Sequence, residues 1–262
     1  MDLKLENKVV LVTGGSQGIG LDIIHCFLAE GAHVANADQH IPKDQLLADR
    51  PATSKGKHLF IQADLCDLDA CQNAVGETIG HYGQIDIVIN NAGVNDGAGL
   101  GNGVEAFTNS LHRNLIHYYA VVESALDALK TSRGVVINIG SKVSVTGQGG
   151  TSGYAAAKGG INALTREWAV DLAPFGIRVN AVLPSETWTP HYKRWLNTMS
   201  NPKAVQNQIE CLIPLGNRLT TSQEISDMVV FLASPRSSHT TGQIIFVDGG
   251  YVHLDRKCTA GD

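Results

Sequence analysis

The chain has 262 residues, of which 43% are hydrophobic, 17% charged and 6% aromatic, with 28 glycines and 8 prolines. This composition excludes a disordered chain and a disulfide-stabilised miniprotein. The 25 acidic and 20 basic side chains give a formal charge of −5, without long basic runs, so nucleic acid is not an expected partner. A chain of this length usually builds one hydrophobic core, and we expect a single domain over residues 1–262.

The cysteines indicate a reducing compartment. There are 5 of them, at positions 26, 66, 71, 211 and 258, and no two form a CxxC pair. Neither a zinc site nor a complete disulfide framework is therefore expected. Residues 1–8 lack the apolar stretch of a signal peptide, and no apolar run approaches the roughly 20 residues that span a bilayer. We expect a cytoplasmic protein with no membrane partner.

Short runs rich in β-branched residues alternate with helical patterns along the chain. Near-continuous apolar strands that alternate with helices are typical of a parallel sheet covered on both faces. The sequence therefore predicts a doubly wound, Rossmann-like α/β fold with a seven-stranded parallel sheet. The predicted strands are 9–12, 33–37, 58–62, 85–89, 135–139, 177–182 and 244–247.

An irregular stretch is expected between Pro184 and Pro214. Pro190 and Pro202 interrupt it, and it holds the aromatic residues Trp188, Tyr192 and Trp195. Long loops inside compact domains are usually functional, so we assign residues 184–214 as a substrate loop. The alternative is a surface excursion fixed by its aromatic side chains.

A glycine-rich loop follows the first predicted strand. Residues 13–20 read TGGSQGIG and lead directly into a helical pattern. Glycines let the backbone turn tightly and approach a pyrophosphate, whose charge then lies at the helix N-terminus. The position of this loop between a strand and a helix predicts nucleotide binding. The expected cofactor contacts here are Gly14, Ser16, Gln17, Gly18, Ile19 and Gly20.

Asp38 indicates which dinucleotide is bound. It ends the second predicted strand, 18 residues after Gly20, where a carboxylate can accept hydrogen bonds from an adenosine ribose. The same carboxylate would repel the 2′-phosphate of NADP, so NAD is the expected cofactor. The alternative is that Asp38 only caps a turn.

Three polar residues make a candidate catalytic group. Tyr154 and Lys158 are four residues apart in an alanine-rich segment, so they share one helix face. Ser141 lies just beyond the predicted strand 135–139, at the carboxyl end where doubly wound sheets bind ligands. An adjacent ammonium and a cationic nicotinamide both favour the phenolate form of a tyrosine. We predict that Tyr154 is the general base, that Ser141 holds the reacting oxygen, and that Lys158 lowers the tyrosine pKa and binds the nicotinamide ribose.

These motifs together resemble the short-chain dehydrogenase/reductase superfamily over essentially the full length. The glycine-rich loop matches its TGxxxGxG motif, residues 90–93 match its NNAG segment, and Ser141, Tyr154 and Lys158 match its catalytic set. The resemblance implies that Asn114 holds a water for proton relay and that Asp64 and Leu65 lie near the adenine. It also implies a homotetramer built through helices near 107–129 and 153–172, and a tail, 251–255, that can reach a neighbouring subunit's pocket. Further cofactor contacts are expected from Asn91, Ala92, Gly93, Pro184 and Thr187.

One departure from the family pattern concerns the substrate. Most members have Pro-Gly after the sixth strand, whereas this chain has Pro-Ser-Glu-Thr at 184–187. Together with several longer stretches of the sequence, this segment resembles the bacterial L-fucose dehydrogenases. Those enzymes oxidise the anomeric hydroxyl of a free sugar to a lactone with NAD or NADP. Polar side chains on the loops suit a polyol, because hydroxyls need directional partners. The candidate substrate residues are Asn95, Ser141, Lys142, Gln148, Tyr154, Glu186, Trp188 and His191.

Alternatives stay open at this point. Lys142 and His191 also suit solvated surface positions. The substrate could instead be another secondary alcohol or polyol, a steroid-like ketone or a hydroxyacyl compound. A non-catalytic NAD-binding regulator would keep the same fold. Such a regulator would be expected to lack a catalytic residue, and here none is missing. No histidine pairs with cysteine or carboxylates at ligand spacing, so no metal site is predicted.

Overall fold

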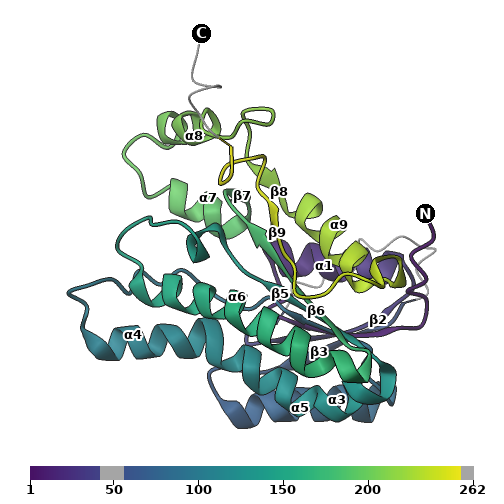
Figure 1. The fold of residues 1–262 in the computed structure, drawn as a ribbon. Helices are drawn as coiled ribbons and strands as arrows, with labels where there is room; N and C mark the ends of the chain where they lie inside the picture. Colours follow the sequence, from purple (N-terminus) through teal and green to yellow (C-terminus); the bar gives the residue numbers. More distant parts are fainter. Residues whose placement is uncertain (42–55, 255–262) are drawn as a thin grey trace.

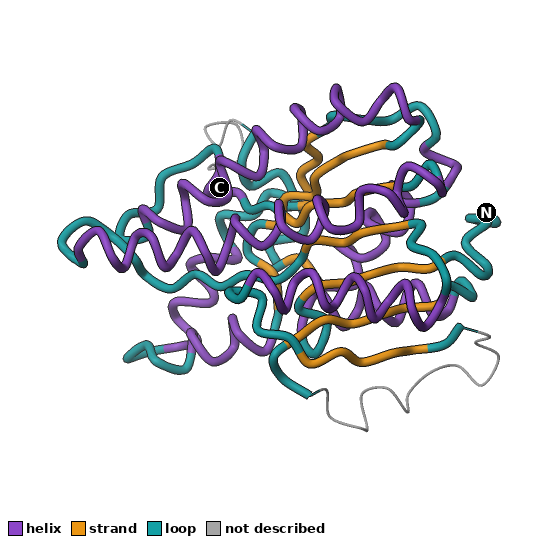
Figure 2. The backbone as a smooth tube through the Cα atoms, turned by 90° about the horizontal axis from the view of Figure 1, so that it is seen from below, coloured by secondary structure: helices purple, strands orange, loops and turns teal. Residues whose placement is uncertain are grey.

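Parallel strands form the central sheet of the computed structural model, which describes residues 1–41 and 56–254. Within these residues the sheet has seven strands in the order β3-β2-β1-β4-β5-β6-β9, all parallel. Figure 2 shows the strands side by side among the helices. The order reverses direction beside β1, as in doubly wound folds. The strands are β1 (Val9–Thr13), β2 (His33–Asp38), β3 (His58–Gln62), β4 (Ile87–Asn90), β5 (Val135–Ile139), β6 (Arg178–Pro184) and β9 (Ile244–Val247). The predicted fold class is confirmed.

Helices cover both faces of the sheet (Figure 1). On one face α1 and α9 pack together over a core that includes Phe27 and Val229. On the other face α3, α5 and α6 cover a second core that includes Tyr118 and Trp168. The helices are α1 (Gly18–Ala29), α3 (Leu68–Tyr82), α4 (Gly103–Leu111), α5 (His117–Ser132), α6 (Ser152–Leu172), α7 (Pro190–Leu196), α8 (Pro202–Glu210) and α9 (Ser222–Ala233).

The helix predicted near 107–129 is not uniform. It consists of the end of α4, a five-residue π-helical segment, His112–Ile116, and α5. A π segment inserts an extra residue into a helix and is often found at functional sites. Hydrophobic periodicity alone does not reveal such an insertion, which here contains the buried Asn114.

The prediction of an irregular loop over 184–214 is wrong. Strand β7 (Thr187–Trp188) pairs with β8 (Thr220–Thr221), and α7 and α8 follow β7. Pro190 and Pro202 are at the start of α7 and α8, where a missing N–H costs nothing and the fixed φ favours the helix. These prolines therefore start helices. The segment lies beyond the sheet, away from α3 and α5 (Figure 1).

No helix in the described part of the chain is both long enough and apolar enough to cross a membrane. Of the tail implied to reach a neighbouring subunit, 251–254 are described, and Asp255 lies outside the described residues.

Candidate active site

The glycine-rich loop leaves the carboxyl end of β1 and packs against the segment that follows β4. Gly14 has φ +67°, and a Cβ at this position would lie 2.8 Å from the Cα of Ala92. The Asn91 amide donates hydrogen bonds to the carbonyls of Thr13 and Gly14, at 3.0 and 2.8 Å. The loop therefore requires glycine at position 14 and is held in place by Asn91.

The N-terminus of α1 is available to an anion. Its N-cap, Gln17, makes no side-chain capping hydrogen bond, and the first turn carries no acidic residue. The first backbone N–H groups of a helix lack intrahelical acceptors and favour negative charge. Thr189 and Pro190 lie beside Gly18, where a Cβ would be 3.6 Å from Thr189 Cβ. The start of α7 thus covers the loop that would hold the pyrophosphate of a dinucleotide.

Asp38 connects the end of β2 to this loop. One carboxylate oxygen accepts a hydrogen bond from the Ser16 backbone N–H at 2.9 Å, and the other accepts one from the His40 N–H at 2.9 Å. The second bond caps a local turn, so part of the alternative interpretation is also observed. Counting these two bonds between described residues, each oxygen has a second lone pair that a ligand hydroxyl can use. Together with the α1 N-terminus, this arrangement fits the pyrophosphate and ribose of a dinucleotide cofactor.

The other expected cofactor residues lie along the same edge of the sheet. Asp64 is exposed and accepts a hydrogen bond from the Cys66 N–H at 3.0 Å, whereas Leu65 is buried. Pro184 ends β6, and the Thr187 hydroxyl donates to the Ser185 carbonyl at 3.3 Å. A Cβ at Gly93 would lie 2.9 Å from Asn114 Oδ1 and 3.5 Å from Lys158 Nζ. This chain segment therefore runs directly beside the candidate catalytic group.

Ser141, Tyr154 and Lys158 meet at the carboxyl end of β5. Ser141 is two residues beyond β5 and caps a short 3₁₀ turn, Lys142–Ser144, and its side chain hydrogen-bonds Tyr154. Tyr154 and Lys158 are both on α6, with the Lys158 Nζ 5.6 Å from the centre of the Tyr154 ring. The structure therefore brings the three side chains together.

The electrostatics of this group differ from the expectation. Burial raises the pKa of Tyr154, the hydrogen bond with Ser141 lowers it, and the nearby Asp96 carboxylate raises it further. Burial also lowers the pKa of Lys158 to about 7. The protein alone therefore favours the neutral phenol, because burial opposes both charged forms. The lysine does not by itself supply the expected lowering of the tyrosine pKa.

Asn114 is buried in the π-helical segment. Its Oδ1 accepts a hydrogen bond from the Val94 N–H at 2.7 Å, and its Nδ2 donates to the Ser110 carbonyl at 3.0 Å. These bonds tie α4 to the segment after β4, next to Gly93 and Lys158. The side chain is thus committed to protein partners, and no bond of it reaches a catalytic side chain within the described residues.

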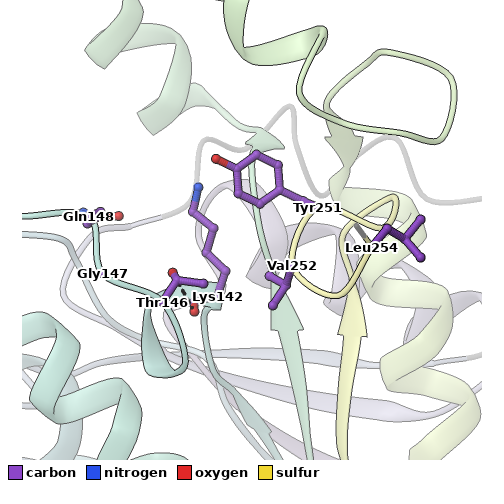
Figure 3. A pocket seen from close by; sticks show the side chains of 7 residues that line it. All are labelled: Lys142, Thr146, Gly147, Gln148, Tyr251, Val252 and Leu254. Atoms are coloured by element: carbon purple, nitrogen blue, oxygen red, sulfur yellow. Dashed lines mark hydrogen bonds between the residues drawn. The ribbon is translucent and has the colours of Figure 1, made fainter. Parts of the chain in front are cut away.

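A cavity of about 540 Å³ lies at the segment that follows Ser141 (Figure 3). Lys142, the next residue after Ser141, lines it, whereas Ser141, Tyr154 and Lys158 are not among its lining residues. Lys142 forms an ion pair with Glu186, and its Nζ lies 4.3 Å from the centre of the Tyr251 ring. Figure 3 shows Lys142 and Tyr251 side by side, with Gln148 across the cavity and Val252 and Leu254 on the side of the tail. The lining residues are Lys142, Thr146, Gly147, Gln148, Tyr251, Val252 and Leu254.

Of the substrate candidates, Lys142 and Gln148 line this cavity, and Glu186 is joined to it through its ion pair with Lys142. The other candidates lie outside the lining. Asn95 is exposed, and its Oδ1 accepts a weak hydrogen bond from the Gly97 N–H at 3.4 Å. Trp188 is 42% exposed, and His191 is exposed on α7. The structure therefore groups Lys142, Gln148 and Glu186 and leaves Asn95, Trp188 and His191 apart from them. Lys142 is paired, so the solvated alternative is wrong for this residue.

Two tyrosines contact the candidate site residues in a way that the sequence did not predict: Tyr118 was not expected at the site, and Tyr251 was expected only as part of a tail that reaches a neighbouring subunit's pocket. Tyr118 contacts Lys158, and Tyr251 contacts Lys142 within its own chain. The spacing of four residues between Asn114 and Tyr118 places them one turn apart and was the available signal for Tyr118. For Tyr251 the only signal was its place in the tail, which carries no information about its partner. Among the described residues, no cluster of three His, Cys, Asp or Glu side chains could hold a metal ion.

Comparisons with known proteins agree with this geometry. A family model described as enoyl-(acyl carrier protein) reductase matches residues 14–252. L-fucose dehydrogenase of Rattus norvegicus is 34% identical over 249 residues, which cover 94% of this chain and 90% of that protein. The 3-oxoacyl-[acyl-carrier-protein] reductase FabG of Thermotoga maritima is 34% identical and covers 95% of this chain and 100% of its own length. The crystal structure of Cj0485 dehydrogenase has a TM-score of 0.93 and 41% identity, with 98% of each chain covered. The chain belongs to the short-chain dehydrogenase/reductase family, whose dehydrogenases use NAD or NADP.

Proposed function

We propose that this protein is an NAD-dependent dehydrogenase that oxidises the anomeric hydroxyl of L-fucose, or of a related aldose, to the lactone. The observation that carries the proposal is the Lys142–Glu186 pair, placed one residue after Ser141 and two residues after the end of β6. A charged pair supplies both donors and acceptors, which suits a substrate with several neighbouring hydroxyls. The likeness to rat L-fucose dehydrogenase supports the same substrate class.

The chemistry follows from the convergence of three side chains. Tyr154, once ionised, accepts the proton of the substrate hydroxyl, while Ser141 hydrogen-bonds the same oxygen and fixes its direction. Lys158 supplies positive charge beside the phenolate and N–H groups for a ribose hydroxyl. Bound NAD supplies the acceptor for the hydride that leaves the same carbon. The proton and hydride leave together, and the C–O single bond becomes the lactone carbonyl.

The preference for NAD rests on Asp38. Its carboxylate lies at the carboxyl end of β2 and contacts the glycine-rich loop through Ser16. A ribose with two free hydroxyls can donate to the remaining lone pairs, whereas a 2′-phosphate would place like charges together. His40, with Nδ1 3.6 Å from Asp38 Oδ1, offsets that repulsion only when it is protonated.

The lining of the cavity supports a deoxy sugar as the proposed aldose. The lining includes the polar side chains of Lys142, Thr146 and Gln148 and the apolar side chains of Val252 and Leu254. A sugar that carries both hydroxyls and a methyl group suits such a mixed lining, because buried polar groups need partners and a methyl group does not. L-Fucose carries both, since its sixth carbon is a methyl group.

The proposal is tested by NADH formation at 340 nm with the purified protein, NAD and a panel of free sugars. Turnover is expected with L-fucose, and more weakly with D-arabinose, which lacks the methyl group, and with L-galactose, which adds a hydroxyl to it. D-Glucose serves as the stereochemical control. Identification of the product as a lactone by mass spectrometry confirms the reacting carbon. Absence of turnover on every aldose would overturn the proposal.

A further inference from the structure

Tyr118 makes a buried contact with Lys158. Tyr118 is on α5 and is fully buried, and its hydroxyl donates a hydrogen bond to the Ile139 carbonyl at 3.0 Å. Lys158 Nζ donates to the Tyr118 oxygen at 3.2 Å and to the same Ile139 carbonyl at 2.8 Å. The three groups come from α5, α6 and the end of β5, and they form a closed triangle.

The directions of these bonds define what Tyr118 does. Because its own hydrogen points to Ile139, its oxygen presents lone pairs to Lys158 and acts as an acceptor. An ammonium has three N–H donors and no acceptor. Within the described residues, Lys158 donates two of its N–H groups, one to Ile139 and one to Tyr118. The third N–H remains for a ligand. The Tyr118 oxygen therefore both orients the lysine and favours its charged form.

We propose that Tyr118 is a positioning residue that holds Lys158 Nζ in place and keeps it protonated during turnover. This inference rests on the proposed dehydrogenase function. Tyr118 acts through Lys158, since its hydroxyl is hydrogen-bonded to the lysine and to the carbonyl at the end of β5. Asn114, one turn earlier on the same continuous helix, holds the neighbouring chain at Val94.

The charge balance around Lys158 makes this contact important. Burial lowers the pKa of Lys158 to about 7, so small changes in its surroundings alter its charge near neutral pH. The titratable groups that face it are Tyr118 and His117 from α5 and Tyr154 from its own helix, with Asp96 acting on Tyr154. His117 is itself buried and its pKa is lowered to about 4 by that burial, so near neutral pH it adds no positive charge. Tyr118 is thus one of two neutral acceptors that favour the charged lysine, the other being the Ile139 carbonyl.

The test is the variant Tyr118→Phe, which keeps the ring and removes only the oxygen. Its matched control is Tyr119→Phe, since Tyr119 is the adjacent tyrosine and is 52% exposed. In Tyr118→Phe, kcat should fall about tenfold with little change in the sugar KM, as for loss of a hydrogen bond to a charged group. The loss of kcat at alkaline pH should begin about one pH unit lower, because the lysine loses its proton more easily.

A purely structural role gives a different pattern. Lower thermal stability with an unchanged alkaline limb of the kcat profile would overturn the proposal, and so would a profile and kcat equal to those of Tyr119→Phe. In both cases the wild type still oxidises the sugar. A failure of the proposed function is different, because the wild type would then oxidise no aldose.

A second measurement needs no substrate. The urea midpoint of the wild type and of Tyr118→Phe is followed between pH 6 and 8.5, each against its Lys158→Met counterpart. The part of stability that depends on Lys158 rises with pH above the pKa of the folded state. This rise should begin about one pH unit lower in Tyr118→Phe. Identical onsets in the two backgrounds would contradict the inference even if no sugar is oxidised.

Discussion

Lys142 forms an ion pair with Glu186 that joins the loop after β5 to the loop after β6. Both side chains are largely shielded, with 13% and 17% of their surfaces exposed, and the Tyr251 ring lies against the lysine. Because Lys142 lines the cavity, the pair offers charged hydrogen-bonding groups to a ligand there. Such groups discriminate strongly between substrates that bond to them and substrates that do not.

Replacement of Glu186 should weaken sugar binding. Glu186→Gln keeps the shape and removes the charge, so the KM for the sugar is expected to rise about tenfold with a smaller change in kcat. Lys142→Met should act in the same direction, and the double variant should lose less than the two single losses combined, because the two side chains interact. Lys193→Met, an exposed lysine on α7, is the control. An unchanged KM in both single variants would exclude the pair from the substrate site.

Tyr154→Phe should abolish turnover and leave dinucleotide binding intact. Removal of a general base typically lowers the rate by a factor of about 10² to 10⁴, while the glycine-rich loop and Asp38 are untouched. The measurements are kcat for sugar oxidation and the NADH dissociation constant by fluorescence. Full activity in this variant would rule out the role of Tyr154 as the base.

Asp38→Ala should shift the cofactor preference toward NADP. The variant removes the repulsion of a 2′-phosphate and also the acceptor for the Ser16 N–H, so activity with NAD falls as well. The ratio of kcat/KM for NAD to that for NADP is therefore the informative quantity, and it should fall by about tenfold or more. Asp64→Ala, at the exposed end of the next strand's loop, is the comparison. If the ratio stays constant, the loop sets the preference and not the carboxylate.

His117 should contribute to unfolding at acid pH. Burial lowers its pKa from 6.5 to about 4, so the unfolded chain binds a proton before the folded chain does. This stability is fully present above pH 6.5 and is lost as pH falls toward 4, by up to about 3 kcal/mol. In urea titrations at pH 7 and 4.5, His117→Gln should lose less stability than the wild type. His112→Gln, at an exposed position in the same segment, should behave like the wild type, and an equal loss in all three proteins would assign acid unfolding to other groups.

We propose a homotetramer that uses the face of α5 and α6. An apolar groove of about 270 Å³ lies between these helices and includes Tyr119, Trp168 and Phe175. Phe175 is 44% exposed and Tyr119 52%, a degree of exposure that marks interaction surfaces when such residues cluster. Light scattering should give four times the mass of one chain, and Tyr119→Glu should reduce it, while Leu68→Glu on α3 should not. A monomeric wild type would contradict the proposal.

Most of the sheet could be predicted from the sequence because parallel strands buried on both faces have a simple pattern. All five residues of β1 and all five of β5 are buried, and their apolar runs are visible in the sequence. The convergence of Ser141 with Tyr154 and Lys158 also follows from local facts, namely the end of a strand and the spacing on one helix. These features depend on short-range geometry.

The parts that could not be predicted depend on contacts between distant segments. The ion pair of Lys142 joins residues 44 positions apart, and the contact of Lys158 with Tyr118 joins residues 40 positions apart. The raised pKa of Tyr154 depends on burial, which a sequence pattern does not specify for a single side chain. Prolines were misleading in 184–214, because a proline at the first position of a helix favours that helix.

The most direct test of the account compares two reactions in the same protein preparation. One is the oxidation of L-fucose with NAD, and the other is the reduction of a 3-oxoacyl thioester with NADH or NADPH, since chains of both named activities are 34% identical to this one. The account predicts that kcat/KM for L-fucose exceeds that for the thioester by at least about tenfold, which corresponds to 1.4 kcal/mol of transition-state preference. A higher kcat/KM for the thioester, with no lactone formed from L-fucose, would contradict it.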